Sequence, residues 1–414
     1  MNAPADVSAL PSNKTEFFPE EDALRERARA VFFLYSILFN RNPRPEAFKK
    51  CMERLEEGLP LDRLYEELAR SDEARRRFSQ NLHLRLPEPS EPIEGNPYSW
   101  KAEDRPLIVD HPIEIMQIEL TNNCPFRCVM CPRTHKMTRD TGLMDINLFK
   151  KIIDELVELN PQYKEGTLPI WFHHFGESLT HPDFADFIRY ANGKGVGTQM
   201  SVNPLMFSKK ISQDLIDANP THLLVAFDGH DNESFEKIRG LPKAYEKSKE
   251  NLLAFLEQKV ASGSKIRIVI SIIDFPLNGE KGDEMRTELE SFWRSVPGVD
   301  DVLWKPFTIW IGDTAAINGL KRPKTEAEQF MQSYMDLRKV TCDFPWKRVA
   351  IAWDGGVIPC CHDYNNIYPL GNVKEQSLKE VWNGPKMVAL RRELRSGNVK
   401  NKLCKDCWRL HTND

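Results

Sequence analysis

The 414-residue sequence lacks any long apolar run. The most apolar stretch near its start, AVFFLYSILF, spans residues 30–39, whereas a membrane-spanning helix needs about 18 consecutive apolar residues. The first twenty residues carry acidic side chains and several prolines, where a secretory signal has a basic start and an apolar stretch. We therefore expect a cytoplasmic protein with no membrane partner.

An excess of basic charge is also missing. Lysine plus arginine number 57 and aspartate plus glutamate 61, which gives a net charge of −4 and no basic footprint for nucleic acid. The hydrophobic fraction of 41% and the charged fraction of 29% are ordinary for globular proteins and exclude a disordered chain. The length allows two or three domains.

The cysteine count is nine, an odd number that does not suit a disulfide framework. Eight of the nine fall in two groups, one formed by Cys124, Cys128 and Cys131, the other by Cys342, Cys360, Cys361, Cys404 and Cys407. In a reducing compartment such grouping indicates metal binding. The ninth, Cys51, is far from both groups in sequence, and we expect it to be an inert thiol.

Composition divides the chain into six segments. These are a disordered or extended tail (1–21), a helical module (22–86), a proline-rich linker (87–110), a βα-repeat region (111–310), a connecting helical segment (311–341) and a cysteine-rich domain (342–414). Six strand-like runs alternate with amphipathic stretches in the fourth segment, at 113–120, 168–175, 195–202, 221–227, 265–273 and 301–307. This alternation predicts a parallel sheet. The expected fold class is α/β, a partial (β/α)6 barrel of the TIM type between a helical module and a small metal-organised domain.

The first cysteine group has the spacing C-x3-C-x2-C and directly follows the first predicted strand. Zinc sites normally use four ligands, whereas cysteine thiolates also hold iron-sulfur clusters. Three thiolates would leave one iron of a cluster open to a ligand, and the alternative is half of a zinc site completed from elsewhere. The segment TNNCPFRCVMCP, which opens a six-strand βα pattern, resembles the radical S-adenosylmethionine (SAM) enzymes.

That resemblance implies a SAM-binding loop after the second strand. HHFGESLTHPDF is similar to the Gly-Gly-Glu-Pro type loop of the family, which receives the methionyl amino group. Gly176 and Glu177 match the loop, while Phe175 replaces its first glycine and Ser178 its proline.

The resemblance also implies four further SAM-binding residues. Asn203 follows the third strand, and AFDGHDNESFEKIRG contains Asp228 and Arg239, of which Arg239 would hold the SAM carboxylate. Met130 stands before the third cysteine, where the family often places an aromatic residue against the adenine. A thioether can also cover an aromatic face.

The C-terminal segment resembles the cysteine-rich SPASM extension in its shortened, single-cluster form, the twitch domain. The resemblance implies a second, fully ligated 4Fe-4S cluster with the ligands Cys342, Cys360, Cys404 and Cys407. Gly355 and Gly356 stand five residues before Cys360 and Cys361 respectively, so either adjacent cysteine could be the ligand, and we choose Cys360. The alternative is a structural zinc site with four cysteines.

By this resemblance the protein reductively cleaves SAM to a 5'-deoxyadenosyl radical, which takes hydrogen from a small molecule, while the auxiliary cluster accepts a second electron. Reduced flavodoxin or ferredoxin would supply the first electron. The helical module is similar to modules found on glycan-modifying enzymes, so the expected substrate is a sugar, cyclitol or glycan precursor. The alternatives are a redox-neutral reaction, a peptide or protein maturase, and a non-catalytic scaffold organised by zinc.

Substrate-contacting residues are expected at the carboxyl ends of the strands, where barrels place their chemistry. The candidates are His173, His174, Asp274, Lys305, Trp310 and Asp313. We select Lys305 or Asp313 as the proton acceptor.

Overall fold

The computed structural model describes residues 20–39, 43–74, 102–166, 168–274, 282–306, 326–334, 342–405 and 407. Residues 1–19 of the expected tail, residues 87–101 of the expected linker, and the candidates Trp310 and Asp313 lie outside this set. Among the described helices, none is both long enough and apolar enough to cross a membrane.

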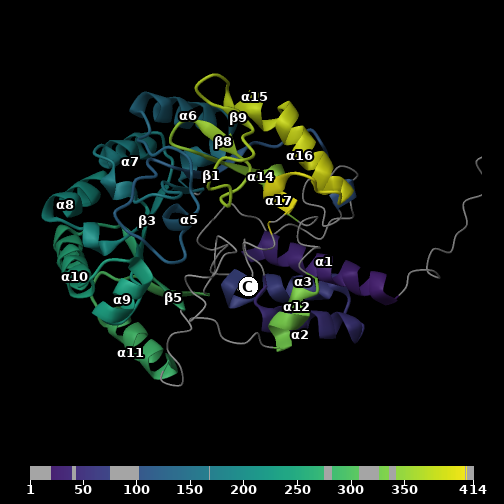
Figure 1. The fold of residues 1–414 in the computed structure, drawn as a ribbon, viewed down its shortest axis with the longest axis horizontal. Coiled ribbons are helices and arrows are strands. Elements are labelled where there is room, and N and C mark those ends of the chain that lie inside the picture. Colours follow the sequence, from purple (N-terminus) through teal and green to yellow (C-terminus); the bar gives the residue numbers. More distant parts are fainter. Residues whose placement is uncertain are drawn as a thin grey trace, which may run out of the picture.

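Six parallel strands lie side by side in a partial barrel (Figure 1). The strands are β1 (Glu114–Ile118), β2 (Ile170–Trp171), β3 (Thr198–Val202), β4 (His222–Ala226), β5 (Arg267–Asp274) and β6 (Asp301–Pro306), and each pairs with the next in chain order. They coincide with the six predicted runs, with β5 ending one residue beyond its run, so the predicted fold class is confirmed.

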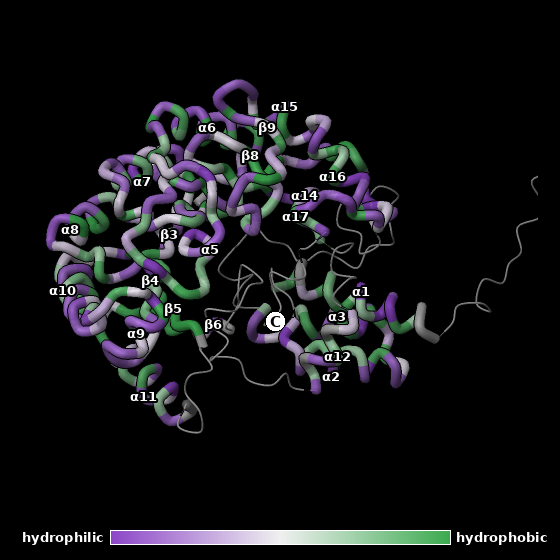
Figure 2. The backbone as a smooth tube through the Cα atoms, in the orientation of Figure 1, coloured by the Kyte–Doolittle hydropathy of each residue, from purple (hydrophilic) through white to green (hydrophobic). Residues whose placement is uncertain are grey.

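Helices cover the outer face of the strands. They include α6 (Ile146–Leu159), α7 (Phe184–Gly193), α8 (Lys209–Ala218), α9 (Asn232–Arg239), α10 (Tyr245–Ser262) and α11 (Gly282–Ser295), with short 3-10 turns η2 (Pro161–Glu165), η3 (Ser178–Thr180) and η4 (Pro204–Met206) between elements. In β4, Leu223 and Val225 are fully buried against these helices, whereas the alternating His222 and Leu224 are half-buried. In Figure 2 the helices alternate between hydrophilic and hydrophobic colours, as expected for amphipathic elements.

The C-terminal domain continues the barrel sheet. Strand β7 (Arg348–Ile351) pairs with β1 in parallel, and β8 (Gly356–Ile358) and β9 (Gly371–Asn372) follow antiparallel. Gly355 makes the β7–β8 turn possible, because its φ of +86° is a conformation that other residues rarely adopt. The domain also contains α14 (Phe344–Lys347), α15 (Leu378–Trp382), α16 (Pro385–Ser396) and α17 (Lys402–Lys405).

The N-terminal helices form a second core. Helices α1 (Glu20–Phe39), α2 (Pro45–Glu56) and α3 (Leu61–Ala69) pack with α12 (Glu326–Gln332), which comes from the expected connecting segment (Figure 1). The Phe48 ring lies 6.0 Å from that of Phe330. Cys51 is buried in this core and burial raises its pKa.

A buried arginine joins helix α1 to the C-terminal domain. Arg105 follows the turn η1 (Ala102–Asp104), and its guanidinium lies 5.5 Å from the Phe33 ring and 4.9 Å from the Trp346 ring. The same side chain donates a hydrogen bond of 2.8 Å to the carbonyl oxygen of Cys342.

Candidate active site at the carboxyl ends of the strands

The loop after β1 carries the first three cysteines and leads into the short helix α5 (Pro132–His135). Cys124, Cys128 and Cys131 lie in one small apolar cluster with Met130 and Ile238. The backbone of α9 holds this loop, because the N–H of Val129 and that of Arg127 donate to the carbonyl oxygens of Ile238 and Arg239, each at 3.0 Å.

The three thiols are close enough to influence one another. Burial raises the pKa of Cys124 to about 12 and that of Cys131 to about 11, and the charge of Cys128 adds to both shifts. Within the described residues, which include all nine cysteines, no three metal-binding side chains converge on a single ion. A 4Fe-4S cluster takes one thiolate per iron, so its ligands stand farther apart than those of one ion.

The loop after β2 lies against the cysteine loop. A Cβ atom at Gly176 would come within 2.0 Å of the carbonyl oxygen of Thr121, so only glycine fits there. The next N–H, that of Glu177, donates to the carbonyl oxygen of Asn123 at 2.8 Å.

Glu177 has a buried carboxylate that receives N–H groups from Asn203 at 2.9 Å and Leu179 at 3.3 Å. Burial raises its pKa to about 7. The side-chain oxygen of Asn203 accepts from the N–H of Leu205, while its Nδ2 is buried without a hydrogen-bond partner. An unpaired buried donor is costly, so this site fits a polar ligand.

Arg239 and Asp228 form a buried ion pair beside the cysteine loop. Asp228 also accepts the N–H of Ile273 at 2.6 Å, and the Nη1 of Arg239 lies 3.5 Å from the sulfur of Cys128. Burial alone would lower the pKa of Arg239, but the charge of Asp228 and the contact with Cys128 together outweigh burial and raise that pKa. The Nε of Arg239 has no partner. In this arrangement Asp228 orients Arg239, and Arg239 keeps a free donor for an anionic ligand.

Lys305 and His173 lie near this pair. Burial lowers the pKa of Lys305. The charge of Asp228 opposes this shift, and the charge of Arg239 adds to it. Burial lowers the pKa of His173 to about 3, with the charges of His174 and Lys305 adding to the shift, so its ring is neutral. Its Nδ1 accepts the N–H of Ser201 at 3.2 Å. The candidate Asp274 is the last residue of β5.

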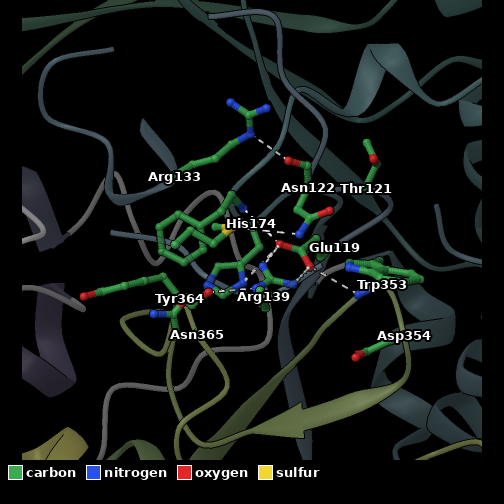
Figure 3. A network of polar contacts seen from close by, with 12 residues as sticks. Glu119, Thr121, Asn122, Arg133, Arg139, His174, Trp353, Asp354, Tyr364 and Asn365 are labelled. Atoms are coloured by element: carbon green, nitrogen blue, oxygen red, sulfur yellow. Dashed lines mark hydrogen bonds and ion pairs between the residues drawn. The ribbon is translucent and has the colours of Figure 1, made fainter. Parts of the chain in front are cut away.

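A network around Glu119 was missed by the sequence analysis (Figure 3). Glu119 directly follows β1 and is fully buried. It pairs with Arg139, and the ring of the candidate His174 lies 3.6 Å away. Its only sequence signal is an acidic residue at the end of an apolar run, five residues before Cys124.

The second cysteine group meets within the C-terminal domain. Burial raises the pKa of Cys342 to about 12, and the charges of Cys407 and Cys360 add to the shift. Burial also raises the pKa of Cys404, and the charges of Cys342, Cys360 and Cys407 add to the shift. Of the adjacent residues Cys360 and Cys361, Cys360 is therefore the one whose charge raises the pKa of both Cys342 and Cys404. These four thiols fit one auxiliary cluster.

Sequence comparisons agree with this architecture. Residues 118–274 match the radical SAM superfamily, and residues 342–408 match SPASM, an iron-sulfur cluster-binding domain. Together they define an enzyme that uses SAM and iron-sulfur clusters. The chain belongs to the radical SAM superfamily and carries a C-terminal SPASM-type domain.

Several relatives have names that indicate different substrates. The chain is 26% identical over 323 residues to a tungsten-containing aldehyde ferredoxin oxidoreductase cofactor-modifying protein of Pyrococcus furiosus, covering 71% of this chain and 87% of the relative. It is 32% identical over 69 residues to the SAM-dependent 2-deoxy-scyllo-inosamine dehydrogenase of Niallia circulans, covering 16% and 28%. It is 23% identical over 133 residues to a PqqA peptide cyclase of Bradyrhizobium diazoefficiens, covering 32% and 33%.

A solved structure also matches. SuiB of Streptococcus suis bound to S-adenosylmethionine shares 15% identity with a TM-score of 0.45, covering 88% of this chain and 83% of that one.

Proposed function

We propose that this enzyme oxidises a small substrate, a sugar, cyclitol or glycan precursor, by removing one hydrogen atom, one proton and one electron. Cys124, Cys128 and Cys131 hold the SAM-binding cluster, and Cys342, Cys360, Cys404 and Cys407 hold the auxiliary cluster. Reduced flavodoxin or ferredoxin in the cytoplasm supplies the first electron.

The observation that carries this proposal is the set of buried polar groups next to the cysteine loop. Glu177 offers a carboxylate for the SAM amino group, and the Nε of Arg239 offers a donor for its carboxylate. The unpaired Nδ2 of Asn203 lies on the residue whose N–H binds Glu177. Met130 packs in the same apolar cluster as the thiols, where it would cover the adenine.

When bound, the cluster and SAM supply a 5'-deoxyadenosyl radical that accepts the substrate hydrogen atom. The chain's residues orient the cofactor: Asp228 fixes the guanidinium of Arg239, and Thr121 and Asn123 fix the loop that carries Glu177. Cys342, Cys360, Cys404 and Cys407 would hold an auxiliary cluster, which would supply an acceptor for the electron left on the substrate.

Lys305 accepts the substrate proton in this proposal. Its amine must be neutral to do so, and burial lowers its pKa. Oxidation should therefore become faster as the pH rises and a larger fraction of Lys305 is neutral. Replacement by arginine, which stays protonated, should abolish oxidation but leave SAM cleavage intact. An unchanged oxidation rate in Lys305→Arg would remove Lys305 from the mechanism. Asp313 stays a second candidate from the sequence analysis.

The proposed small substrate is supported by the two relatives named as a 2-deoxy-scyllo-inosamine dehydrogenase and a cofactor-modifying protein. Peptide modification is the alternative, because another relative is named as a peptide cyclase. Copurification of a peptide, or loss of activity toward a peptide after removal of residues 1–90, would favour that alternative.

Iron and sulfide analysis under anaerobic conditions tests the cluster assignment. Two clusters predict about eight irons per chain, and a Cys124→Ala, Cys128→Ala, Cys131→Ala triple variant should keep about four. With dithionite and SAM, the wild type should produce 5'-deoxyadenosine and the triple variant none. A colourless protein that contains zinc would refute the proposal and support the scaffold alternative.

A further inference from the structure

The carboxylate of Glu119 receives donors from three separate segments of the chain. Its Oε2 accepts from the Nη1 of Arg139 at 2.6 Å and from the N–H of Trp353 at 3.3 Å. Its Oε1 accepts from the Nη2 of Arg139 and from the N–H of Phe175 at 3.3 Å. Arg139 lies after the cysteine loop, Phe175 opens the Gly176–Glu177 loop, and Trp353 belongs to the auxiliary domain, so one buried side chain joins all three.

Arg139 and His174, which contact Glu119, also contact the auxiliary domain directly. Arg139 donates from Nε to the carbonyl oxygen of Tyr364 at 2.7 Å, and the Nε2 of His174 lies 2.8 Å from the carbonyl oxygen of Cys361 (Figure 3). The Oδ1 of Asn365 accepts the N–H of Thr138 at 2.8 Å. The contacts converge on residues 353–365, the segment that contains Cys360.

The contacts of Glu119 depend on its negative charge. Glu119 is fully buried, and burial alone would raise its pKa, but Arg139, His174 and the N–H of Trp353 together outweigh burial and lower it. A glutamine would remove the charge and place an NH₂ group among donors from Arg139, Phe175 and Trp353. Two of those donors are backbone groups, which cannot turn away, so the segments themselves would have to move.

We propose that Glu119 is a positioning residue that locks residues 353–365 of the auxiliary domain to the SAM-binding loop, so that the two cluster sites keep one fixed arrangement. This inference rests on the proposed function. It predicts that SAM binding at the Gly176–Glu177 loop also restrains residues 353–365. By linkage, loosening those residues must then weaken SAM binding by the same factor.

The test uses the anaerobic holoenzyme and measures amide hydrogen exchange with and without SAM. In the wild type, SAM should slow exchange in residues 353–365 at least about fivefold, a typical coupling between sites. In Glu119→Gln this protection should disappear, and the SAM affinity should fall by the same factor, at least about fivefold.

Glu114→Gln is the matched control. Glu114 lies at the other end of β1 and pairs with Arg348 of β7 at 3.6 Å, so it also joins the barrel to the auxiliary domain. It is partly exposed and lies at the opposite end of β1 from Glu119. This variant should keep the SAM-dependent protection and the wild-type affinity.

A double variant separates positioning from charge neutralisation. Glu119→Gln combined with Arg139→Met removes both charges, which should restore the thermal stability lost in Glu119→Gln because no unpaired buried charge remains. The positioning role predicts that SAM-dependent protection stays absent in the double variant. If protection and affinity return, Glu119 only neutralises Arg139 and the proposal is wrong.

The same measurements test the proposed function separately from the role of Glu119. A wild type without iron, or without SAM binding, would refute the proposed function. A wild type with both clusters and normal SAM binding, but with no protection of residues 353–365, would refute only the role of Glu119.

Discussion

Replacing Gly176 by alanine should impair SAM cleavage without removing the cluster. The new Cβ would lie 2.0 Å from the carbonyl oxygen of Thr121 and 2.8 Å from the Cα of Asn122, whereas ordinary contact begins at 3.4 Å. Both neighbours are backbone atoms, so the loop that carries Glu177 must move by more than about 1 Å. A displacement of that size at a positioning group costs about a hundredfold in rate.

The assay is 5'-deoxyadenosine formation with dithionite and SAM, together with iron content. Gly176→Ala should keep about eight irons per chain, lose about a hundredfold in rate and lose about 1–3 kcal/mol in the free energy of unfolding, as for other overpacked sites. Gly193→Ala is the control, because a Cβ there meets nothing within 4 Å. A wild-type rate in Gly176→Ala would show that this loop does not position SAM.

Three further predictions concern single side chains. Cys360→Ala should lose about four irons per chain, the content of one cluster, while Cys361→Ala keeps them; the reverse pattern would shift the ligand by one residue. Arg239→Lys should weaken SAM binding about tenfold in equilibrium dialysis, because lysine cannot bind Asp228 and a ligand through one planar group; unchanged binding would exclude Arg239 from the SAM site. Arg105→Met should lower the free energy of unfolding by about 1.5–3 kcal/mol, the value of a charged hydrogen bond; an unchanged denaturation midpoint would contradict the importance of its bond to Cys342.

The barrel strands could be predicted because each is a short apolar run between amphipathic helices. The strand β2 is shorter than its run. Beyond it, His173 accepts the N–H of Ser201 in β3, and the ring of His174 lies against the carbonyl oxygen of Cys361. The position of β7 beside β1 could not be predicted, because pairing between strands so distant in sequence leaves no local pattern. The packing of α12 with the N-terminal helices was missed for the same reason.

The candidate site was partly predictable from spacing and resemblance. Cysteine spacing marks the cluster loops, and the residues selected from the family pattern, including Glu177 and Arg239, lie beside the first loop. Glu119 escaped detection because an acidic residue at a strand end is usually solvated. Its partners Arg139, His174 and Trp353 come from three segments that only the fold brings together.

The parallel pairing of β1 with β7 has a consequence for how the chain is made. An unpaired strand edge exposes a row of N–H and C=O groups that invites pairing with other chains. During synthesis β1 emerges early, and its partner residues 348–351 emerge more than two hundred residues later. Until then the edge of β1 is open, and such long-range pairing forms slowly. A chain truncated before Arg348 should therefore aggregate even though it contains all six barrel strands.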